Sequence, residues 1–381
     1  MRAVRFIHTS DIHLDTSLAG AGFPSRLGDR KREAIRATLR RILDDARSQA
    51  VDFVLIAGDL FEHDRVTPDT IEFLKQQFAD STPVRIFIAP GNHDPYLRGS
   101  PYCEEVWPAN VHIFRDEQFR SVDLPHLGTR ITGFGYNRAR LQDPRFRDLP
   151  TLADDLINVI VAHGSDTSRI PGGKAVHIPL TIDEIAGKNV RYCALGHYHQ
   201  QGRVSNPIDG TQVWYSGIPE GRGWDEEGPC AYLLVEIDQE QVRVESRPCN
   251  QFPLRTLEIA CDGFSSREQV IGAILDNRDS LFDSSTILRV RLTGELDPRL
   301  DLSLSEMEER LAGAALHIQW EDRTESALDF NLLACEGTLA GQFVRELNER
   351  IERLTDSERP ALERARLYGV QALLGREVRL K

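Results

Sequence analysis

The chain has 381 residues, enough for two to three domains at a typical ~150 residues each. Its 46 lysines and arginines against 59 aspartates and glutamates give a formal net charge of −13, so the surface as a whole repels polyanions, and charge alone argues against nucleic acid as a ligand. Hydrophobic residues at 40% and charged residues at 28% are typical of a globular protein and exclude the disordered and fibrous classes.

The N-terminal third alternates strands and helices. Strands rich in Val, Ile and Phe are predicted over residues 3–9, 52–57 and 84–89. Apolar residues at helical spacing predict a helix over 26–49 and a second one that begins at Thr67 as N-cap, with Pro68 in its first turn. Two strand–helix–strand units in series imply parallel strands, so the loops after these strands meet at one edge of a sheet.

The middle of the chain is rich in short strands, which predicts a second sheet packed on the first. We expect these strands within residues 111–134 and over 157–162, 191–195, 212–215, 231–237 and 242–247. The last three of them are predicted to be antiparallel edge or closing strands.

Around Asn250 the organisation changes. Three strands and two helices alternate there as a compact βαβαβ set, which we interpret as a separate small domain: 254–260, 265–277, 286–292, 305–312 and 315–320. Two amphipathic helices follow over 336–354 and about 358–374, which predicts a helical hairpin at the end of the chain.

Five strand ends carry side chains that bind metals. In chain order they deliver Asp11 and His13; Asp59; Asn92 and His93; His163; and His197 and His199. Because parallel strands align their carboxyl ends, these loops can converge on one point. Carboxylate, amide and imidazole donors without thiolates favour Mn²⁺, Fe or Zn over a structural zinc site, and the set is too large for one ion. The sequence therefore predicts a dinuclear metal centre.

Two divalent ions ~3.5–4 Å apart can bind the oxygens of a phosphate and lower the pKa of a bridging water, which supplies hydroxide for in-line attack. Glycines precede the ligands at positions 58, 91 and 196, and we expect them to provide the positive φ of sharp turns. Taken singly, each motif also fits an ordinary loop or turn; together, each at a strand end, they favour the metal centre. The remaining histidines default to structural or surface roles: His8, His63, His112, His126, His177 and His317.

The motifs DxH, GD, GNHD, H and GHxH resemble those of the calcineurin-like metallophosphoesterase superfamily, over about residues 4–247. The resemblance implies an α/β fold, a four-layer αββα sandwich. It also implies that Asp59 bridges two metals, and that His93 is catalytic, stabilising charge on the phosphate or protonating the leaving oxygen, with Asp94 as an orienting partner. One metal would then be held by Asp11, His13, Asp59 and His199, and the other by Asp59, Asn92, His163 and His197.

Within the superfamily, the stretch from Asp11 to Phe61 is similar to the DNA repair exonuclease branch, the SbcD-type nuclease subunits that work with SMC-type ATPases. This resemblance implies a nuclease domain over 1–249, an α+β capping domain over 250–325, and a C-terminal helical segment over 326–381 that binds the ATPase. Several such nucleases carry a histidine directly after GDLF, where this chain has Glu62.

The implied activity is hydrolysis of DNA phosphodiester bonds by a metal-bridging hydroxide, with His93 assisting. The implied cofactor is a pair of divalent ions, with Mn²⁺ expected and Fe, Zn or Mg as alternatives. An alternative substrate is a small nucleotide or a phosphomonoester, which the charge of −13 makes credible. A scaffold with a vestigial metal site is a third hypothesis, and the complete ligand set argues against it.

The helix over 26–49 carries eight basic and four acidic residues, a local charge of +4 in an acidic protein. It follows the first metal motif, so we consider its Arg30 and Lys31 as contacts for a DNA backbone, beside the ordinary reading of a solvated helix face. A second candidate strip consists of Arg138, Arg140, Arg145 and Arg147.

The absence of a long apolar run and of a signal-peptide pattern predicts a cytoplasmic protein without a membrane partner. The six cysteines form no CxxC pair, which argues against a zinc knuckle or a disulfide framework. The sequence leaves a homodimer open.

Overall fold

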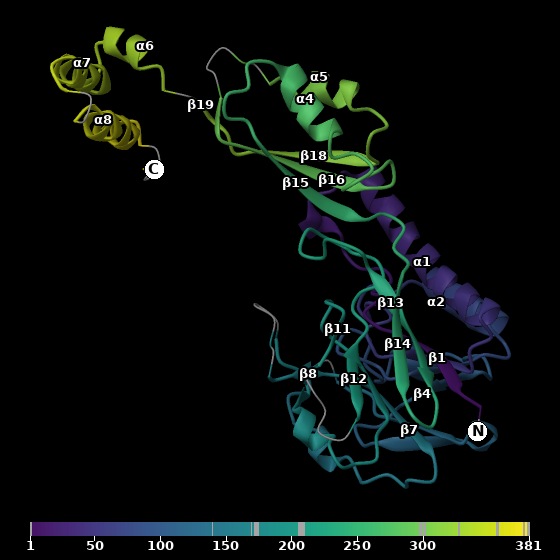
Figure 1. The fold of residues 1–381 in the computed structure, drawn as a ribbon. Coiled ribbons are helices and arrows are strands. Elements are labelled where there is room, and N and C mark those ends of the chain that lie inside the picture. Colours follow the sequence, from purple (N-terminus) through teal and green to yellow (C-terminus); the bar gives the residue numbers. More distant parts are fainter. Residues whose placement is uncertain are drawn as a thin grey trace. The chain divides into compact units, whose positions relative to one another are not determined.

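The computed structural model describes residues 2–138, 140–168, 170, 175–204, 210–296, 300, 302–326, 328–355, 358–375 and 378. The chain divides into two compact units (Figure 1). The first comprises residues 1–255 and 284–287, and the second comprises 256–283 and 288–381. The three-domain division expected from the sequence stays a prediction.

The first sheet of the first unit has six strands in the order β14-β13-β1-β2-β3-β4. β1 to β4 are parallel, whereas β13 and β14 close the other edge as antiparallel strands. Their bounds are β1 Val4–Thr9, β2 Phe53–Ile56, β3 Arg85–Ile88, β4 Val111–Ile113, β13 Ala231–Ile237 and β14 Val242–Pro248.

The second sheet also has six strands, in the order β11-β12-β10-β7-β6-β5. Their bounds are β5 Arg120–Leu124, β6 Thr129–Gly133, β7 Ile157–His163, β10 Tyr192–Gly196, β11 Gly202–Arg203 and β12 Gln212–Tyr215. β12 runs parallel to β10, so the expectation of an antiparallel strand over 212–215 holds only for its pairing with β11. The reason is that β11 reverses the chain first and pairs antiparallel with β12.

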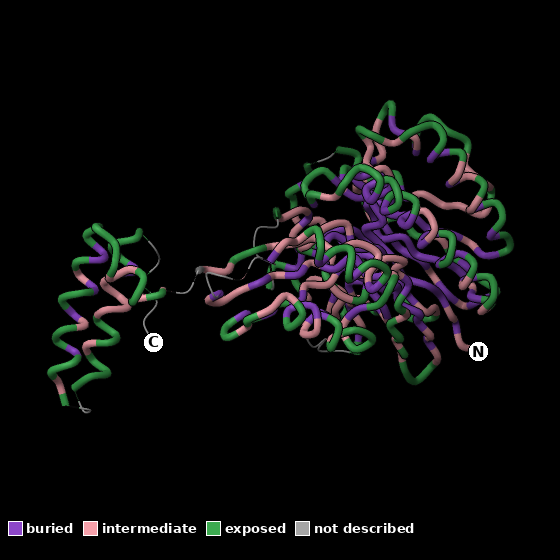
Figure 2. The backbone as a smooth tube through the Cα atoms, turned by 90° about the horizontal axis from the view of Figure 1, so that it is seen from above, coloured by how far each residue is buried: buried purple, intermediate pink, exposed green. Residues whose placement is uncertain are grey.

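The two sheets pack face to face. Aromatic and aliphatic side chains of both inner faces form one core, in which the rings of Phe6 and Phe53 stack with centroids 4.8 Å apart and lie against Val159 and Tyr192. In Figure 2 the buried residues gather in the interior of the part of the chain that holds the N-terminus. Because alternate residues of a strand face opposite sides, the outer face of each sheet also carries apolar side chains, which other elements must cover.

Helices cover the outer face of the first sheet. α1 (Ser25–Ser48) and α2 (Pro68–Asp80) bury their apolar stripes against it, including Leu39 of α1 and Phe78 of α2. Over the outer face of the second sheet, the short 3₁₀ helices η3 (Phe146–Asp148) and η4 (Ile182–Glu184) contribute Phe146 and Ile182 to another core cluster. The αββα arrangement is thus confirmed, with short helical turns in its fourth layer.

Lys31 lies on the buried side of α1. Its side chain is fully buried and pairs with Glu220, and its Nζ also donates to the carbonyl oxygen of Phe252 at 2.9 Å. Glu220 accepts a further hydrogen bond from Thr38 at 2.9 Å. The proposal that Lys31 contacts a DNA backbone is therefore wrong, because the helix face that carries it points into the protein.

The second unit contains a three-stranded sheet in the order β15-β16-β18, with helices α4 and α5 completing its core, as the βαβαβ pattern predicts. The bounds are β15 Leu254–Ala260, α4 Arg267–Leu275, β16 Ile287–Thr293, α5 Leu304–Arg310 and β18 His317–Asp322, with a small pair of β17 Glu295–Leu296 and β19 Glu325–Ser326.

The C-terminal helices form the expected hairpin. α7 (Leu339–Glu352) packs against α8 (Arg359–Leu373), and Val344, Leu347 and Val370 are buried. A short helix that the sequence pattern does not predict, α6 (Phe330–Cys335), precedes them. Among the described residues, no helix has the length and apolar character needed to cross a membrane.

Replacing Lys31 by Ala should destabilise the fold by about 3–5 kcal/mol, because it leaves the Glu220 carboxylate buried without its cation. Urea unfolding followed by circular dichroism measures this. Arg32→Ala on the same helix is the matched control, since Arg32 pairs with Asp29 in solvent and such pairs contribute about 0–1 kcal/mol. Equal losses for the two variants would contradict the structural role of the buried pair.

Candidate metal centre

The structure brings all eight residues of the predicted set together at the carboxyl ends of five strands. β1, β2 and β3 are mutually parallel in the first sheet, and β7 and β10 are parallel in the second. The side chains that follow these strands, or end them, are Asp11 and His13 (β1), Asp59 (β2), Asn92 and His93 (β3), His163 (β7), and His197 and His199 (β10).

The backbone of these loops is held in uncommon conformations. Asp11, His13, Asp59 and His197 all have positive φ, between 51° and 108°. Each such residue costs about 1–3 kcal/mol, which the surrounding structure must offset. Hydrogen bonds between the loops do this: the amide of Asp11 donates to the carbonyl of Gly58 at 3.0 Å, and that of His13 to the carbonyl of Asp59 at 2.9 Å.

The three motif glycines serve two purposes. Gly58 has a φ of +86°, as expected for a sharp turn. Gly91 and Gly196 do not have positive φ, so that expectation is wrong for them. They are required by close packing instead, because a Cβ on Gly91 would overlap the Asp59 carboxylate and one on Gly196 would overlap the Ala57 carbonyl oxygen.

Asp59 lies between two groups of donor atoms. Its Oδ2 is 3.8 Å from His13 Nε2 and 3.3 Å from His163 Nε2. Asp11, His13 and His199 form one group, in which His199 Nε2 lies 3.7 Å from Asp11 Oδ1. Asp11, Asp59 and His163 form the other. These separations suit a cation placed within each group.

Each of the four histidines expected to be ligands has one ring nitrogen held by an acceptor of the protein, which leaves the other nitrogen for a metal. The held atoms are His13 Nδ1 (Glu62, 2.8 Å), His199 Nδ1 (Glu226, 2.5 Å), His163 Nδ1 (Ala57 carbonyl, 2.9 Å) and His197 Nε2 (Ala175 carbonyl, 2.9 Å). The opposite nitrogen of His13, Nε2, is buried without a hydrogen-bond partner among the described residues. An orphaned lone pair beside two buried carboxylates fits a bound cation.

The charges of the site also fit metal binding. Burial lowers the pKa of His13 to about 4, with the Arg222 charge acting in the same direction, and burial likewise lowers the pKa of His197 to about 4. Burial disfavours a charged His163 too, but the Asp59 carboxylate outweighs it and raises the pKa of His163 to about 9. Burial would raise the pKa of Asp59, yet the His163 charge holds it well below its usual range.

His93 does not join either metal group, and its side chain is 44% exposed. Its Nδ1 lies 2.7 Å from Glu62 Oε2. Burial lowers the pKa of His93, but the hydrogen bond to Glu62 and the charge of Asp59 outweigh burial and leave the pKa above its ordinary value. A raised pKa on an imidazole that is partly open to solvent suits an electrostatic or acid role.

Asp94 does not orient His93, so the expectation of a His93–Asp94 pair is wrong. Its two carboxylate oxygens accept hydrogen bonds at 2.7–2.9 Å from the amides of Asp59, Leu60 and Gly91 and from the hydroxyl of Tyr102. Burial and the nearby Asp59 charge raise the pKa of Asp94 to about 7. The residue holds the loop after β2 in place.

Sequence reasoning missed three residues at the site: Glu62, Arg222 and Glu226. Arg222 Nη2 donates to Glu226 Oε1 at 2.8 Å, and Nη1 lies 3.9 Å from Glu62 Oε1. Glu62 was signalled only by its place after the GDLF motif. No local pattern signals Arg222 and Glu226, because the histidines that they surround come from other segments of the chain.

The two-sheet sandwich and the mixed carboxylate, amide and imidazole donors at its strand ends are those of a metal-dependent hydrolase of phosphate esters. Residues 4–201, about half of the chain, match the family model of the calcineurin-like phosphoesterases, and the chain belongs to that family.

Relatives with curated names cover part of the chain. It is 29% identical over 246 residues to an uncharacterized metallophosphoesterase, YhaO, from Bacillus subtilis, in a match that covers 63% of this chain and 59% of the relative. It is 28% identical to the DNA double-strand break repair protein Mre11 of Methanopyrus kandleri, over 62% of this chain and 54% of that protein. The match therefore spans only somewhat more than half of either relative.

Among solved structures, a dimetal phosphatase from Danio rerio matches 64% of this chain and 96% of its own, with 14% identity and a TM-score of 0.41.

The affinity for Mn²⁺ should rise about tenfold per pH unit between pH 6 and 8 and level off above about 9. The reason is that His163, with its pKa raised to about 9, must lose its proton to bind a metal, whereas His13 and His197 are already neutral. Electron paramagnetic resonance of free Mn²⁺ measures the affinity. A pH-independent affinity over this range would contradict a role for His163 as a ligand.

Proposed function

We propose that this chain is a two-metal phosphodiesterase that hydrolyses DNA, acting as a DNA repair exonuclease. The family supports phosphoester hydrolysis, and the relative named for DNA double-strand break repair supports DNA as the substrate. The observation that carries the proposal is a pocket of about 860 Å³ lined by Asp15 and Thr16, directly after the His13 motif, and by Arg65, three residues after Glu62. A single phosphate needs no adjoining space of this size, whereas a nucleic acid strand does.

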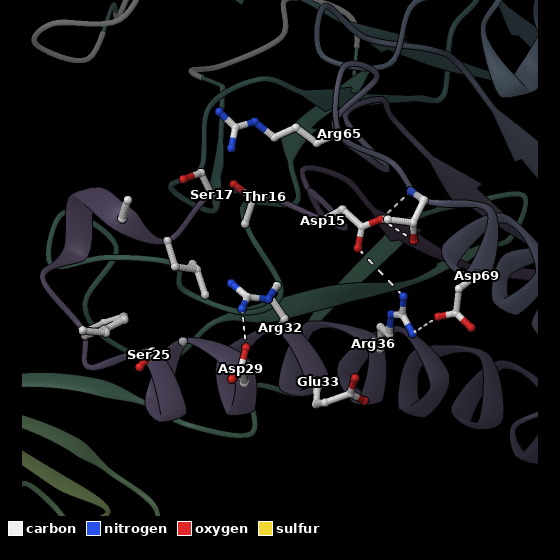
Figure 3. A pocket seen from close by; sticks show the side chains of 15 residues that line it. Asp15, Thr16, Ser17, Ser25, Asp29, Arg32, Glu33, Arg36, Arg65 and Asp69 are labelled. Carbon is white, nitrogen blue, oxygen red and sulfur yellow. Dashed lines mark hydrogen bonds and ion pairs between the residues drawn. The ribbon is translucent and has the colours of Figure 1, made fainter.

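Arg65 is the basic residue of this pocket that is open to a ligand. Its side chain has no ion-pair or hydrogen-bond partner among the described residues, and Figure 3 shows it across the pocket from Arg32 and Arg36 of α1. Arg36 is already paired with Asp69 at 2.7 Å, and Arg32 with Asp29. A phosphate of the strand next to the scissile one would find an unpaired guanidinium at Arg65.

The residues divide the work of hydrolysis among themselves. Asp11, His13 and His199 would hold one ion, Asn92, His163 and His197 the other, and Asp59 both. When bound, the two ions supply positive charge for the phosphate oxygens and acidify a water for attack. His93, held through Nδ1 by Glu62, has Nε2 left to stabilise the charge on the phosphate or to give a proton to the leaving oxygen. We expect Mn²⁺ as the ion.

The C-terminal hairpin is the segment that we propose to bind an SMC-type ATPase. Part of the apolar face of α7 packs inside the hairpin, where Leu347 and Ile351 are buried. Leu332 of α6 and Leu339 of α7 remain 62% and 68% exposed, as a docking surface requires.

A second candidate is hydrolysis of a small nucleotide or phosphomonoester. It is favoured by the pairing of three α1 arginines with acidic neighbours, Arg32–Asp29, Arg36–Asp69 and Arg47–Asp44, which leaves less free positive charge than the sequence suggests. The experiments below separate it from a nuclease.

Replacing His93 by Ala should lower the turnover of end-labelled DNA by about 10²- to 10⁴-fold while two metals remain bound, because His93 contributes proton transfer or charge stabilisation and no metal ligand. Gel analysis of the DNA and metal analysis by mass spectrometry measure both. The exposed His126 provides a matched control, as His126→Ala should change neither. Cleavage of bis-p-nitrophenyl phosphate without any cleavage of DNA would favour the small-substrate alternative.

Replacing Arg65 by Gln should raise the KM for an oligonucleotide and reduce the slope of log KM against log salt by about 1, because one phosphate contact is lost. The hydrolysis of bis-p-nitrophenyl phosphate, which has no second phosphate to contact Arg65, should not change. Arg243→Gln on β14 is the control for removal of one positive charge. An unchanged salt slope would remove the pocket from the DNA-binding surface.

A further inference from the structure

Glu62 joins two histidines of the site. Its Oε1 lies 2.8 Å from His13 Nδ1, and its Oε2 lies 2.7 Å from His93 Nδ1. The two imidazole rings meet edge to face with their centroids 4.8 Å apart. The Glu62 side chain is 17% exposed, so little water competes for its oxygens. One carboxylate therefore contacts both an expected metal ligand and the expected catalytic histidine.

The backbone fixes Glu62 to the loops that carry these two histidines. Its amide donates to the carbonyl of Leu14 at 3.0 Å, next to His13. The following amide, of His63, donates to the carbonyl of His93 at 2.9 Å. The main chain of Glu62 is thus held next to the main chain of both histidines, independently of its side-chain contacts.

Arg222 extends this arrangement to the third histidine. It lies 3.9 Å from Glu62 and is hydrogen-bonded to Glu226, whose Oε1 is 2.5 Å from His199 Nδ1. The guanidinium charge stabilises both carboxylates as acceptors. Glu62 and Glu226 are therefore alike in that each contacts Nδ1 of an expected metal ligand, His13 or His199. They differ because Glu62 also contacts His93, whereas Glu226 contacts no second histidine of the site among the residues that the structure describes.

We propose that Glu62 is a positioning residue, which holds the imidazoles of His13 and His93 as their Nδ1–H forms so that both turn Nε2 toward the reaction. The proposal rests on the hydrolytic function proposed above. Two N–H donors need two acceptor oxygens, which a carboxylate offers and a carboxamide does not. Glutamine at position 62 can accept from one ring only, so the other must rotate or change its tautomer.

The side chains of His13, Glu62 and His93 also form a group that could hold a cation. Their N···O distances of 2.7 and 2.8 Å are those of direct hydrogen bonds, and Glu62 spans the two rings without an atom between. The geometry therefore favours positioning, and a third ion becomes an outcome of the test.

The kinetic test is a double-mutant cycle with bis-p-nitrophenyl phosphate, on the full chain loaded with Mn²⁺. Glu62→Gln should lower kcat about tenfold with KM nearly unchanged, and Glu62→Asp, which keeps both oxygens, should retain more activity. In the His93→Ala background the Glu62→Gln change should cost clearly less than it does in the wild type, because the part that acts through His93 is already lost and only the part that acts through His13 remains. Losses that multiply would overturn the proposal.

Glu226→Gln is the matched control. It replaces the carboxylate that accepts from His199 by a neutral carboxamide but leaves His93 untouched, so any effect that it has should be undiminished in the His93→Ala background. Metal analysis accompanies each variant: two ions per chain are expected throughout the Glu62 series. A third ion in the wild type that Glu62→Gln removes would overturn the positioning role.

A spectroscopic readout does not depend on activity. In metal-free protein with ¹⁵N-labelled histidine, long-range ¹H–¹⁵N spectra should show a protonated Nδ1 for His93, assigned through His93→Ala. Glu62→Gln should change this signal or that of His13, and Glu226→Gln should change neither. If the wild type hydrolyses no phosphodiester, the proposed function fails, and these spectra still decide the role of Glu62: an unchanged His13 and His93 in Glu62→Gln overturns it.

Discussion

The site depends on the contact between the two sheets at the carboxyl ends of their central strands. Gly196, at the end of β10, approaches the Ala57 carbonyl after β2 so closely that no side chain fits. This contact places histidines of the second sheet, His163 among them, against Asp59 of the first. Packing of β-sheets at the usual ~10 Å would keep the loops apart, so the small residues at this edge create the metal centre.

Bringing the strand ends together concentrates negative charge in a buried region. Asp11 and Asp59 are both buried, and isolated buried carboxylates are unfavourable by several kcal/mol each. The His163 charge, with its pKa raised by Asp59, compensates part of this. The left-handed backbone at Asp11, His13 and Asp59 adds further strain. Such a cluster destabilises the folded protein, and a bound cation would offset the cost of the buried carboxylates.

Local sequence was enough to predict that eight side chains gather at the strand ends, since each lies at the end of an apolar strand or in the loop that follows it. It predicted most strands and helices for the same reason. It failed where a partner comes from a distant segment: Glu226 contacts His199, and Asp94 serves the loop after β2. It also failed for Lys31, because a count of charges on a helix does not show which face is buried. The residues that support the expected ligands come from other segments of the chain, so short sequence motifs cannot predict them.

The distribution of charge changes what the net value of −13 means for the substrate. Four of the negative charges, Asp11, Asp59, Glu62 and Glu226, belong to the centre, where Arg222 and the histidines surround them. Two divalent ions would add four positive charges at the point where a phosphate must bind. Three of the seven arginines of α1 pair with acidic neighbours: Arg32, Arg36 and Arg47. Attraction for a polyanion would thus come from the centre and from the unpaired Arg65 beside it, while the acidic remainder of the surface limits nonspecific binding.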